Sequence, residues 1–213
     1  MSDHRSTRVR VAVCCLWSVV AVSFVLAQPG CSLFSRGDTI GEPMNLIAVM
    51  PIERDEPSSG ALLPGAESVV TAQIYGVLSR SPEWHFVPDL TVVQALKQIP
   101  RTGELPARAR DLGKAVNADG VIYGTVSRYI EREGSEYGAR SPAAVSFKLY
   151  FISVSTGRIL WNGAFDEQQQ PLTSNLFNWW QFWQGGPRWF TAKEFTRLGV
   201  ERLLGELAKK LGY

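Results

Sequence analysis

The feature that most constrains this fold is a block in the middle of the chain in which apolar and polar residues alternate. Residues 145–151 and 159–165 both place an apolar residue at every second position, and Thr156 and Gly157 lie between them. A period of two puts one face of each strand on a core, and a Thr-Gly pair is typical of a tight hairpin turn. Residues 120–126 supply a third strand after a turn. We therefore predict a three-stranded antiparallel meander with one buried face.

Helical periodicity upstream of this block supplies the helices that must cover such a sheet. Residues 66–78 place their apolar side chains on one helical face. Asp89 is the predicted N-cap of a second helix, which turns Val92 and Val93 inward. A third, short helix is predicted over residues 107–116, whose apolar residues recur at helical spacing.

Two more strands and a terminal helix complete the predicted elements. Residues 45–52 are a continuous apolar run, typical of a strand buried on both faces, and the charged residues from Glu53 onward are expected to end it. Residues 84–87 predict a short strand. Thr191 followed by Glu194 is a capping box, which begins a long C-terminal helix with an apolar stripe.

The order of these elements predicts the fold class. It is β-α-β-α-α-β-β-β with a long helix at the end. This order is typical of a single α/β domain with a mixed sheet and a C-terminal antiparallel three-strand meander covered by helices. Residues 131–142 are charged, contain glycine and end in proline, so we expect a mobile, solvated connection at the sheet edge.

The first thirty residues are typical of an export signal. Arg5, Arg8 and Arg10 form a basic region, and an uncharged apolar run follows over residues 11–27. The chain is therefore expected to have three parts: a signal peptide over residues 1–30, a polar tether over residues 31–44 and an α/β periplasmic domain over residues 45–213.

Cys31 is the candidate lipid anchor. With Gly30 directly before it, it resembles the acylated first residue of a mature bacterial lipoprotein. Cys14 and Cys15 fall inside the leader, so the mature chain keeps one cysteine and can form no intramolecular disulfide. Two alternatives stay open, namely ordinary cleavage near Ala27 with plain secretion, and an uncleaved membrane anchor.

The net charge and the small number of potential catalytic side chains argue against several classes of function. The net charge is +2, and the leader contributes all of it, so nothing favours a nucleic-acid partner. His85 is the only histidine after the leader. If Cys31 is acylated, the mature chain has no Cys/His pair for nucleophilic catalysis and too few ligands for a zinc site. We therefore expect a protein that is not an enzyme and that binds neither a metal ion nor a cofactor. The enzymatic alternative, a carboxylate-dependent cell-wall hydrolase, needs Glu131, Asp166 and Glu167 to converge in a cleft.

Aromatic side chains are concentrated in residues 175–190, around the break Gly185-Gly186-Pro187. Three interpretations stay open: the rings fold back over the sheet, they form a docking surface for a partner protein, or they touch lipid headgroups. The candidate partner-binding residues are Trp179, Trp180, Phe182, Trp183 and Trp189.

Three motifs resemble a known family. They are ARDLG at 109–113, ADGVIYGTV at 118–126 and STGRILW at 155–161. They are similar to a bacterial envelope lipoprotein superfamily that includes the curli secretion lipoprotein CsgG, the penicillin-binding-protein activator LpoB and the N-terminal domain of TolB. The resemblance implies a compact periplasmic α/β domain, tethered to the outer membrane, that acts by protein contact. Residues 131–142 are too short and too charged for the barrel hairpins of the curli channel.

These observations predict a lipid-anchored periplasmic accessory or assembly factor that acts by protein–protein contact at the outer membrane. Its expected partners are the membrane, through an N-terminal acyl anchor, and an envelope protein, with homo-oligomer formation left open and no nucleic acid. The first alternative is an oligomeric component of an envelope secretion system. The second is the carboxylate-dependent hydrolase described above.

Overall fold

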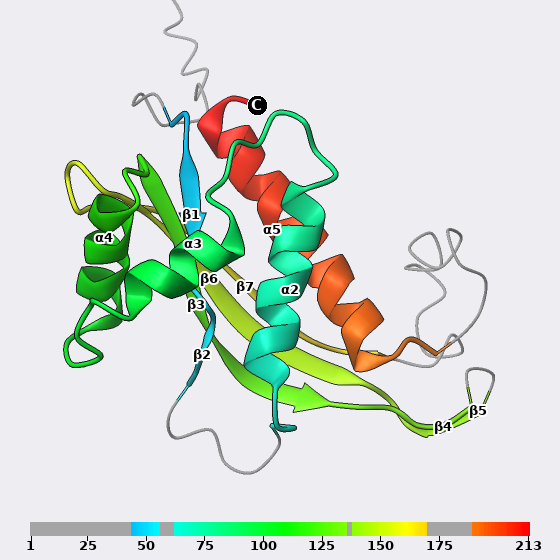
Figure 1. Ribbon diagram of the computed structural model, residues 1–213. Helices are drawn as coiled ribbons and strands as arrows, with labels where there is room; N and C mark the ends of the chain where they lie inside the picture. The colour runs from blue at the N-terminus through cyan, green and yellow to red at the C-terminus, as the bar shows by residue number, and fades with distance from the viewer. Residues whose placement is uncertain (1–43, 56–61, 136–137, 170–188) are drawn as a thin grey trace, which may run out of the picture. The chain divides into compact units, whose positions relative to one another are not determined.

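The computed structural model describes residues 44–55, 62–135, 138–169 and 189–213. Its main sheet is mixed, as predicted, with the strand order β1-β3-β6-β7 and with β2 also paired to β3 (Figure 1). The strands are β1 (Ile47–Val49), β2 (Glu53–Arg54), β3 (Gly120–Ile130), β6 (Ala144–Ser153) and β7 (Ile159–Gln168). β1 and β2 run parallel to β3, whereas β3, β6 and β7 form the predicted antiparallel meander. The short strand predicted at residues 84–87 contributes one parallel bridge, between Phe86 and Ile47.

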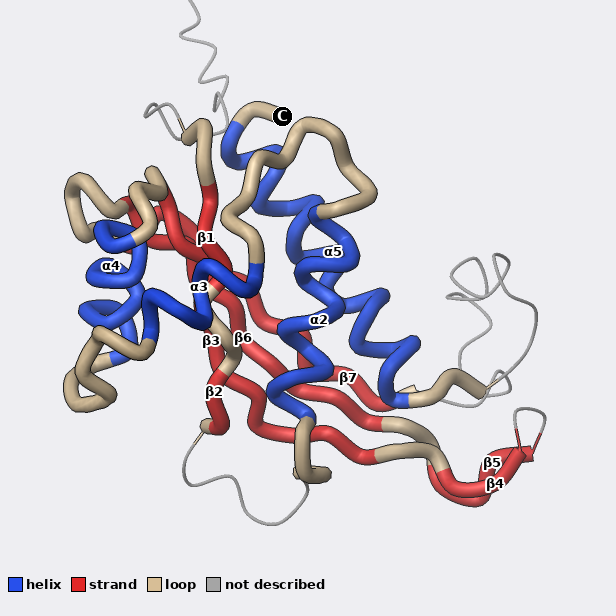
Figure 2. Tube along the Cα trace, in the orientation of Figure 1, coloured by secondary structure: helices blue, strands red, loops and turns tan. Residues whose placement is uncertain are grey.

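Four helices in the described part of the chain cover this sheet (Figure 2). They are α2 (Ala66–Leu78), α3 (Asp89–Leu96), α4 (Leu105–Ala115) and α5 (Ala192–Leu211). α2 and α5 pack together on one face of the sheet, and α3 and α4 pack on the opposite face. The predicted α/β class and the long C-terminal helix are confirmed.

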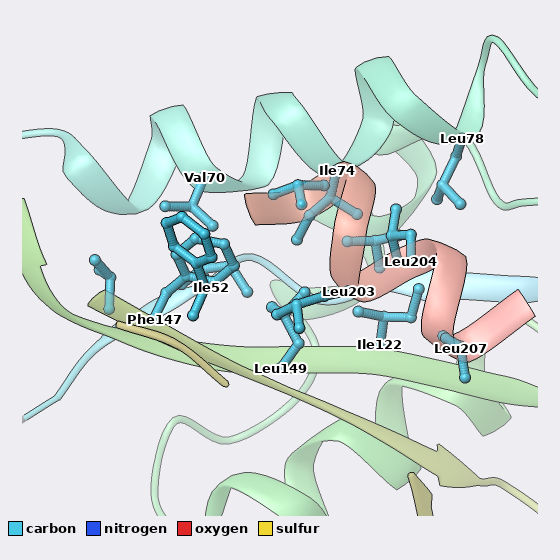
Figure 3. Close-up of a cluster of buried hydrophobic side chains, with 14 of the residues drawn as sticks. Ile52, Val70, Ile74, Leu78, Ile122, Phe147, Leu149, Leu203, Leu204 and Leu207 are labelled. Carbon is cyan, nitrogen blue, oxygen red and sulfur yellow. The ribbon is translucent and has the colours of Figure 1, made fainter. Parts of the chain in front are cut away.

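The larger of two cores lies between the sheet and the helices α2 and α5 (Figure 3). Residues three and four positions apart on each helix face this core, as the helical period requires. Each fully buried aliphatic or aromatic side chain stabilises the fold by about 1.5–3 kcal/mol. The side chains at the centre of this core are at most 1% exposed: Val70, Ile74, Leu78, Ile122, Phe147, Leu149, Leu203, Leu204 and Leu207.

The smaller core lies under α3 and α4. Ala48 and Met50 point into it, while their neighbours in β1 point into the larger core, so the prediction of a strand buried on both faces is confirmed. The predicted end of this strand at Glu53 is wrong. Three residues separate Val49 from Glu53, but only two separate their partners on β3, so the chain bulges around Pro51 and then pairs again as β2.

The observed starts of the helices agree only in part with those predicted from the sequence. Pro88, not Asp89, occupies the N-cap of α3 and makes no side-chain cap hydrogen bond. Asp89 is instead the first helical residue, where its negative charge is favourable to the helix dipole. Val93, predicted to face inward, is 42% exposed. α5 begins as predicted, with a complete capping box between Thr191 and Glu194.

Residues 131–142 do not form the predicted loop. β4 (Glu133–Ser135) and β5 (Gly138–Ser141) pair as an antiparallel two-stranded ribbon. Figure 1 shows this ribbon beyond the ends of β3 and β6, past the helices. Because β3 and β6 are antiparallel neighbours, continuing their pairing satisfies the backbone hydrogen bonds of the charged segment. The residues of β4 are exposed, so their side chains are solvated as predicted.

Candidate docking site

The candidate site lies where the chain leaves β7 and returns to α5. Gln169, directly after β7, is 5% exposed and donates its backbone N–H to the carbonyl oxygen of Ala143 at 3.0 Å. Its side-chain Oε1 accepts a hydrogen bond from the backbone N–H of Phe190 at 2.8 Å. This bond joins two residues that are 21 positions apart, so the described residues on either side of residues 170–188 are held together.

Two residues at the end of β3 fix the returning chain. Arg132 Nη1 donates to the carbonyl oxygen of Trp189 at 2.9 Å, and Glu131 Oε1 accepts from the backbone N–H of Ala192 at 3.0 Å. The prediction of a solvated connection is wrong for Glu131 and Arg132, because the first N–H groups of α5 lack helical partners and a carboxylate satisfies one of them. We call the set Glu131, Arg132, Gln169, Trp189 and Phe190 the clamp.

Tyr129 lies beside the clamp on β3 and is 6% exposed. Burial, and after it the charge of Glu131, raises the pKa of Tyr129 to about 12, while a hydrogen bond with Thr196 acts in the opposite direction. Tyr129 is therefore neutral at physiological pH, and Glu131 supplies the negative charge that faces the N-terminus of α5.

The structure describes one of the predicted site residues. Trp189 is half-buried, with its carbonyl oxygen bound by Arg132. The candidate lipid anchor Cys31 lies outside the described residues, as do the predicted signal peptide and most of the predicted tether. The same holds for the other candidate partner-binding residues, Trp179, Trp180, Phe182 and Trp183. Both assignments therefore stay predictions.

The carboxylates of the hydrolase alternative have separate partners. Asp166 pairs with Arg128, and Glu167 pairs with Arg202 at 2.8 Å. Adjacent residues of a strand point to opposite faces of the sheet, so these two side chains diverge. Glu131 is bound to the first turn of α5. The three carboxylates therefore do not share a cleft in which one could donate and another accept a proton.

His85 is exposed, and its backbone carbonyl accepts a hydrogen bond from the N–H of Ile47 at 2.9 Å. In the part of the chain that the structure describes, no three His, Cys, Asp or Glu side chains are grouped closely enough to hold a metal ion. None of the helices described here has the length and apolar character needed to cross a membrane.

A groove that the sequence reasoning missed opens between α3 and α4, beside the bulge at Pro51. Its volume is about 800 Å³. The sequence signal for it is weak, because its basic and apolar residues come from α3, the chain between α3 and α4, α4 itself and the bulge at Pro51. It is lined by Pro51, Glu53, Val93, Leu96, Lys97, Ile99, Arg101 and Arg108.

The sequence matches no protein-family model, and no curated protein matches it. Among solved structures, the C-terminal domain of LpoB from Salmonella enterica is 19% identical over 62% of this chain and 88% of that chain, with a TM-score of 0.43. A lipoprotein from Neisseria meningitidis is 21% identical over 66% of this chain and 91% of its own, with a TM-score of 0.45. PelC from Paraburkholderia phytofirmans, solved as a dodecamer, is 14% identical over 76% and 86% of the two chains, with a TM-score of 0.46. Because these TM-scores are low, the similarities assign neither a family nor a function to this chain.

Proposed function

We propose that this protein is an exported, lipid-anchored accessory or assembly factor, which works by protein–protein contact at the periplasmic face of the outer membrane. In this proposal Cys31 carries the lipid, and the chain needs neither a catalytic group nor a cofactor. The partner-binding face consists of Trp179, Trp180, Phe182, Trp183 and Trp189.

The leader supports the location. A basic region followed by an uncharged apolar run is typical of an export signal, and Cys31 directly follows it. A lone cysteine in an exported chain cannot form an internal disulfide, and acylation accounts for its presence. Stable anchoring needs more than one acyl chain, which a multiply acylated N-terminal cysteine supplies.

The observation that carries the partner-binding face is the clamp. The sequence between β7 and α5 contains four of the seven tryptophans of the chain, Trp179, Trp180, Trp183 and Trp189. The clamp joins the described residues on either side of residues 170–188, namely Gln169 and Phe190. Tryptophan side chains contribute strongly to binding at protein interfaces. A tryptophan-rich sequence that begins and ends at a fixed base is well suited to partner binding.

The test is affinity capture of envelope proteins with the full-length protein, followed by mass spectrometry. We expect wild type to capture a defined partner, and we expect Trp180→Ala plus Trp183→Ala to abolish that capture while the melting temperature stays near the wild-type value. The matched control, Leu176→Ala plus Phe177→Ala, removes apolar side chains from the same segment outside the candidate set and should retain capture.

Two outcomes would contradict the proposal. A large fall in melting temperature of the tryptophan variant would show that these rings pack against the domain, as in the first interpretation of the segment. Undiminished capture by a stable variant would place the partner elsewhere on the protein.

A further inference from the structure

The groove between α3 and α4 combines an apolar surface with an excess of positive charge. Figure 1 shows α3 and α4 near each other, and both helices contact β1. The groove opens beside Pro51, where the bulge interrupts the parallel pairing of the chain with β3. A volume of about 800 Å³ is within the usual range of ligand sites.

Three basic side chains and one acidic side chain line this groove. Arg108 Nη1 pairs with Glu53 Oε1 at 2.8 Å, which neutralises both groups. Lys97 and Arg101 are exposed and form no ion pair with any residue of the described chain. Because no acidic lining residue remains to balance them, Lys97 and Arg101 give the groove a net positive charge that a ligand can complement.

The side chain of Arg108, in the wall of the groove, has one donor without a hydrogen-bond partner. Its side chain is 16% exposed, and its Nε is buried with no hydrogen-bond partner among the described residues. A buried donor without a partner is unfavourable, so a small rotation that brings this N–H to a ligand oxygen would gain a hydrogen bond.

The apolar part of the surface extends past the groove along α3. Val93 is 42% exposed on the rim, and Leu90, one turn earlier on the same helix, is 75% exposed. Large apolar side chains grouped in this way on a soluble surface indicate a contact site. A small acid confined to the groove would leave Leu90 uncovered, whereas a peptide crossing the rim would cover it.

We propose that this groove binds a peptide segment of a partner protein in which acidic and apolar side chains lie close together. The carboxylates of that segment pair with Lys97 and Arg101, and its apolar side chains cover Leu96, Ile99 and the exposed face of α3. None of the residues that line this groove belongs to the clamp or to residues 175–190, so the proposal does not depend on the function proposed above.

A neighbouring hollow carries an acidic side chain that forms no ion pair in the described chain. It shares Pro51 and Val93 with the groove, has a volume of about 290 Å³ and is lined by Asp89 and by Glu67, which pairs with Arg54 at 3.0 Å. An acidic peptide that slipped across Val93 would meet the like charge of Asp89, which disfavours binding there. The position of the acidic side chains in the groove is therefore fixed by attraction on one side and repulsion on the other.

The test is fluorescence anisotropy on the full-length protein in detergent micelles. The probe is a fluorescein-labelled peptide in which glutamate and leucine alternate, and the control peptide has glutamine in place of every glutamate. We expect the acidic peptide to bind more tightly than the control peptide, with a Kd that rises with salt. Lys97→Glu plus Arg101→Glu should raise that Kd by about tenfold or more.

Two further variants make the result specific. Lys209→Glu plus Lys210→Glu, at the end of α5, changes the net charge by the same amount as the groove variant. It should leave the Kd within about twofold of wild type. Val93→Ser should weaken binding of the acidic peptide. Because Val93 is exposed, this variant should stay folded, which a thermal melt checks. The tryptophan variant of the previous section should bind the peptide normally, so the two proposals fail separately.

Equal binding of the acidic and glutamine peptides would overturn the proposal, as would the absence of any binding by wild type. An equal loss of affinity in the α5 charge variant would also overturn it, because the effect would then come from overall charge and not from the groove.

Discussion

The carboxylate of Glu131 accepts a hydrogen bond from the backbone N–H of Ala192 at 3.0 Å, across 61 positions of the sequence. It joins the end of β3 to the first turn of α5. The capping box of Thr191 and Glu194 satisfies further N–H groups at the same helix end. The N-terminus of α5 is therefore capped twice, once by its own sequence and once by the sheet.

Removing this second cap should destabilise the domain. We expect Glu131→Ala to lower the free energy of unfolding by about 1–2 kcal/mol, because it removes a hydrogen bond and a favourable charge at a helix N-terminus. Urea unfolding followed by circular dichroism measures it. Glu133→Ala, on the exposed strand β4, should change stability by less than about 0.5 kcal/mol. Equal effects of the two substitutions would show that Glu131 is not a cap.

A second prediction concerns the buried hydroxyl of Tyr123. This side chain is 2% exposed, and its hydroxyl has no hydrogen-bond partner in the described structure. Tyr123→Phe should raise the free energy of unfolding by about 1 kcal/mol, because it removes an unsatisfied polar group from the smaller core. Tyr75→Phe is the comparison, since the Tyr75 hydroxyl donates to the carbonyl oxygen of Val49 at 3.3 Å, and it should lower stability by about 1 kcal/mol. A Tyr123→Phe variant less stable than Tyr75→Phe would contradict this account.

The same residue predicts a loss of stability at alkaline pH. Burial, and after it the neighbouring Tyr150, raises the pKa of Tyr123 to about 12, above the ordinary value of about 10. Below about pH 10 the tyrosine is protonated in both states; between about pH 10 and 12 the unfolded state binds fewer protons, so stability falls. Urea midpoints measured over this range should fall less steeply in Tyr123→Phe than in wild type. Tyr129, whose pKa is also raised, contributes to the loss of stability in both proteins, so the slope should not fall to zero in the variant. Identical slopes in the two proteins would refute the assignment to Tyr123.

A third prediction tests the close approach of two strands. A Cβ on Gly124 of β3 would lie 2.1 Å from the backbone carbonyl oxygen of Lys148 on β6, which cannot move without breaking the sheet. Gly124→Ala should therefore cost about 2–3 kcal/mol or more in thermal or urea unfolding. A Cβ on Gly205 of α5 would meet open space, and Gly205→Ala should raise stability by about 0.5–1 kcal/mol through helix propensity. Tolerance of alanine at Gly124 would mean that the register of β3 and β6 differs.

A fourth prediction tests the lipid anchor. Cys31→Ser should release the protein into the soluble periplasm, because the acyl chains attached there supply the membrane affinity. Fractionation of the cell envelope measures the distribution. Cys15→Ser, inside the leader, should leave it on the membrane. If Cys31→Ser also stays on the membrane, the anchor is not a lipid at this cysteine.

Much of the fold could be predicted from local patterns. The alternation at residues 145–151 determines which side chains face a core, and the capping box at Thr191 determines where α5 begins, because both rules involve residues within a few positions of one another. The start of α3 was misplaced by one residue because a proline and an aspartate in succession both suit a helix start. The pairing of Glu53 and Arg54 was missed because charged residues follow the apolar run, and only the bulge at Pro51, which no local pattern shows, brings them back into register with β3.

The docking site and the groove depended on contacts that no local pattern contains. Residues 131–142 have the composition of a solvated connection, yet Glu131 caps a helix that begins 61 positions later. Gln169 meets Phe190, and Arg108 meets Glu53, only because the sheet brings their elements together. The sequence by itself determined the four helices, the central strands and most of the faces that they bury, but not the pairing of β2, the β4–β5 ribbon or the exposure of Val93. The tertiary structure alone decided which charged side chains find partners, since a polar group's partner depends on distances in space and not on spacing along the chain.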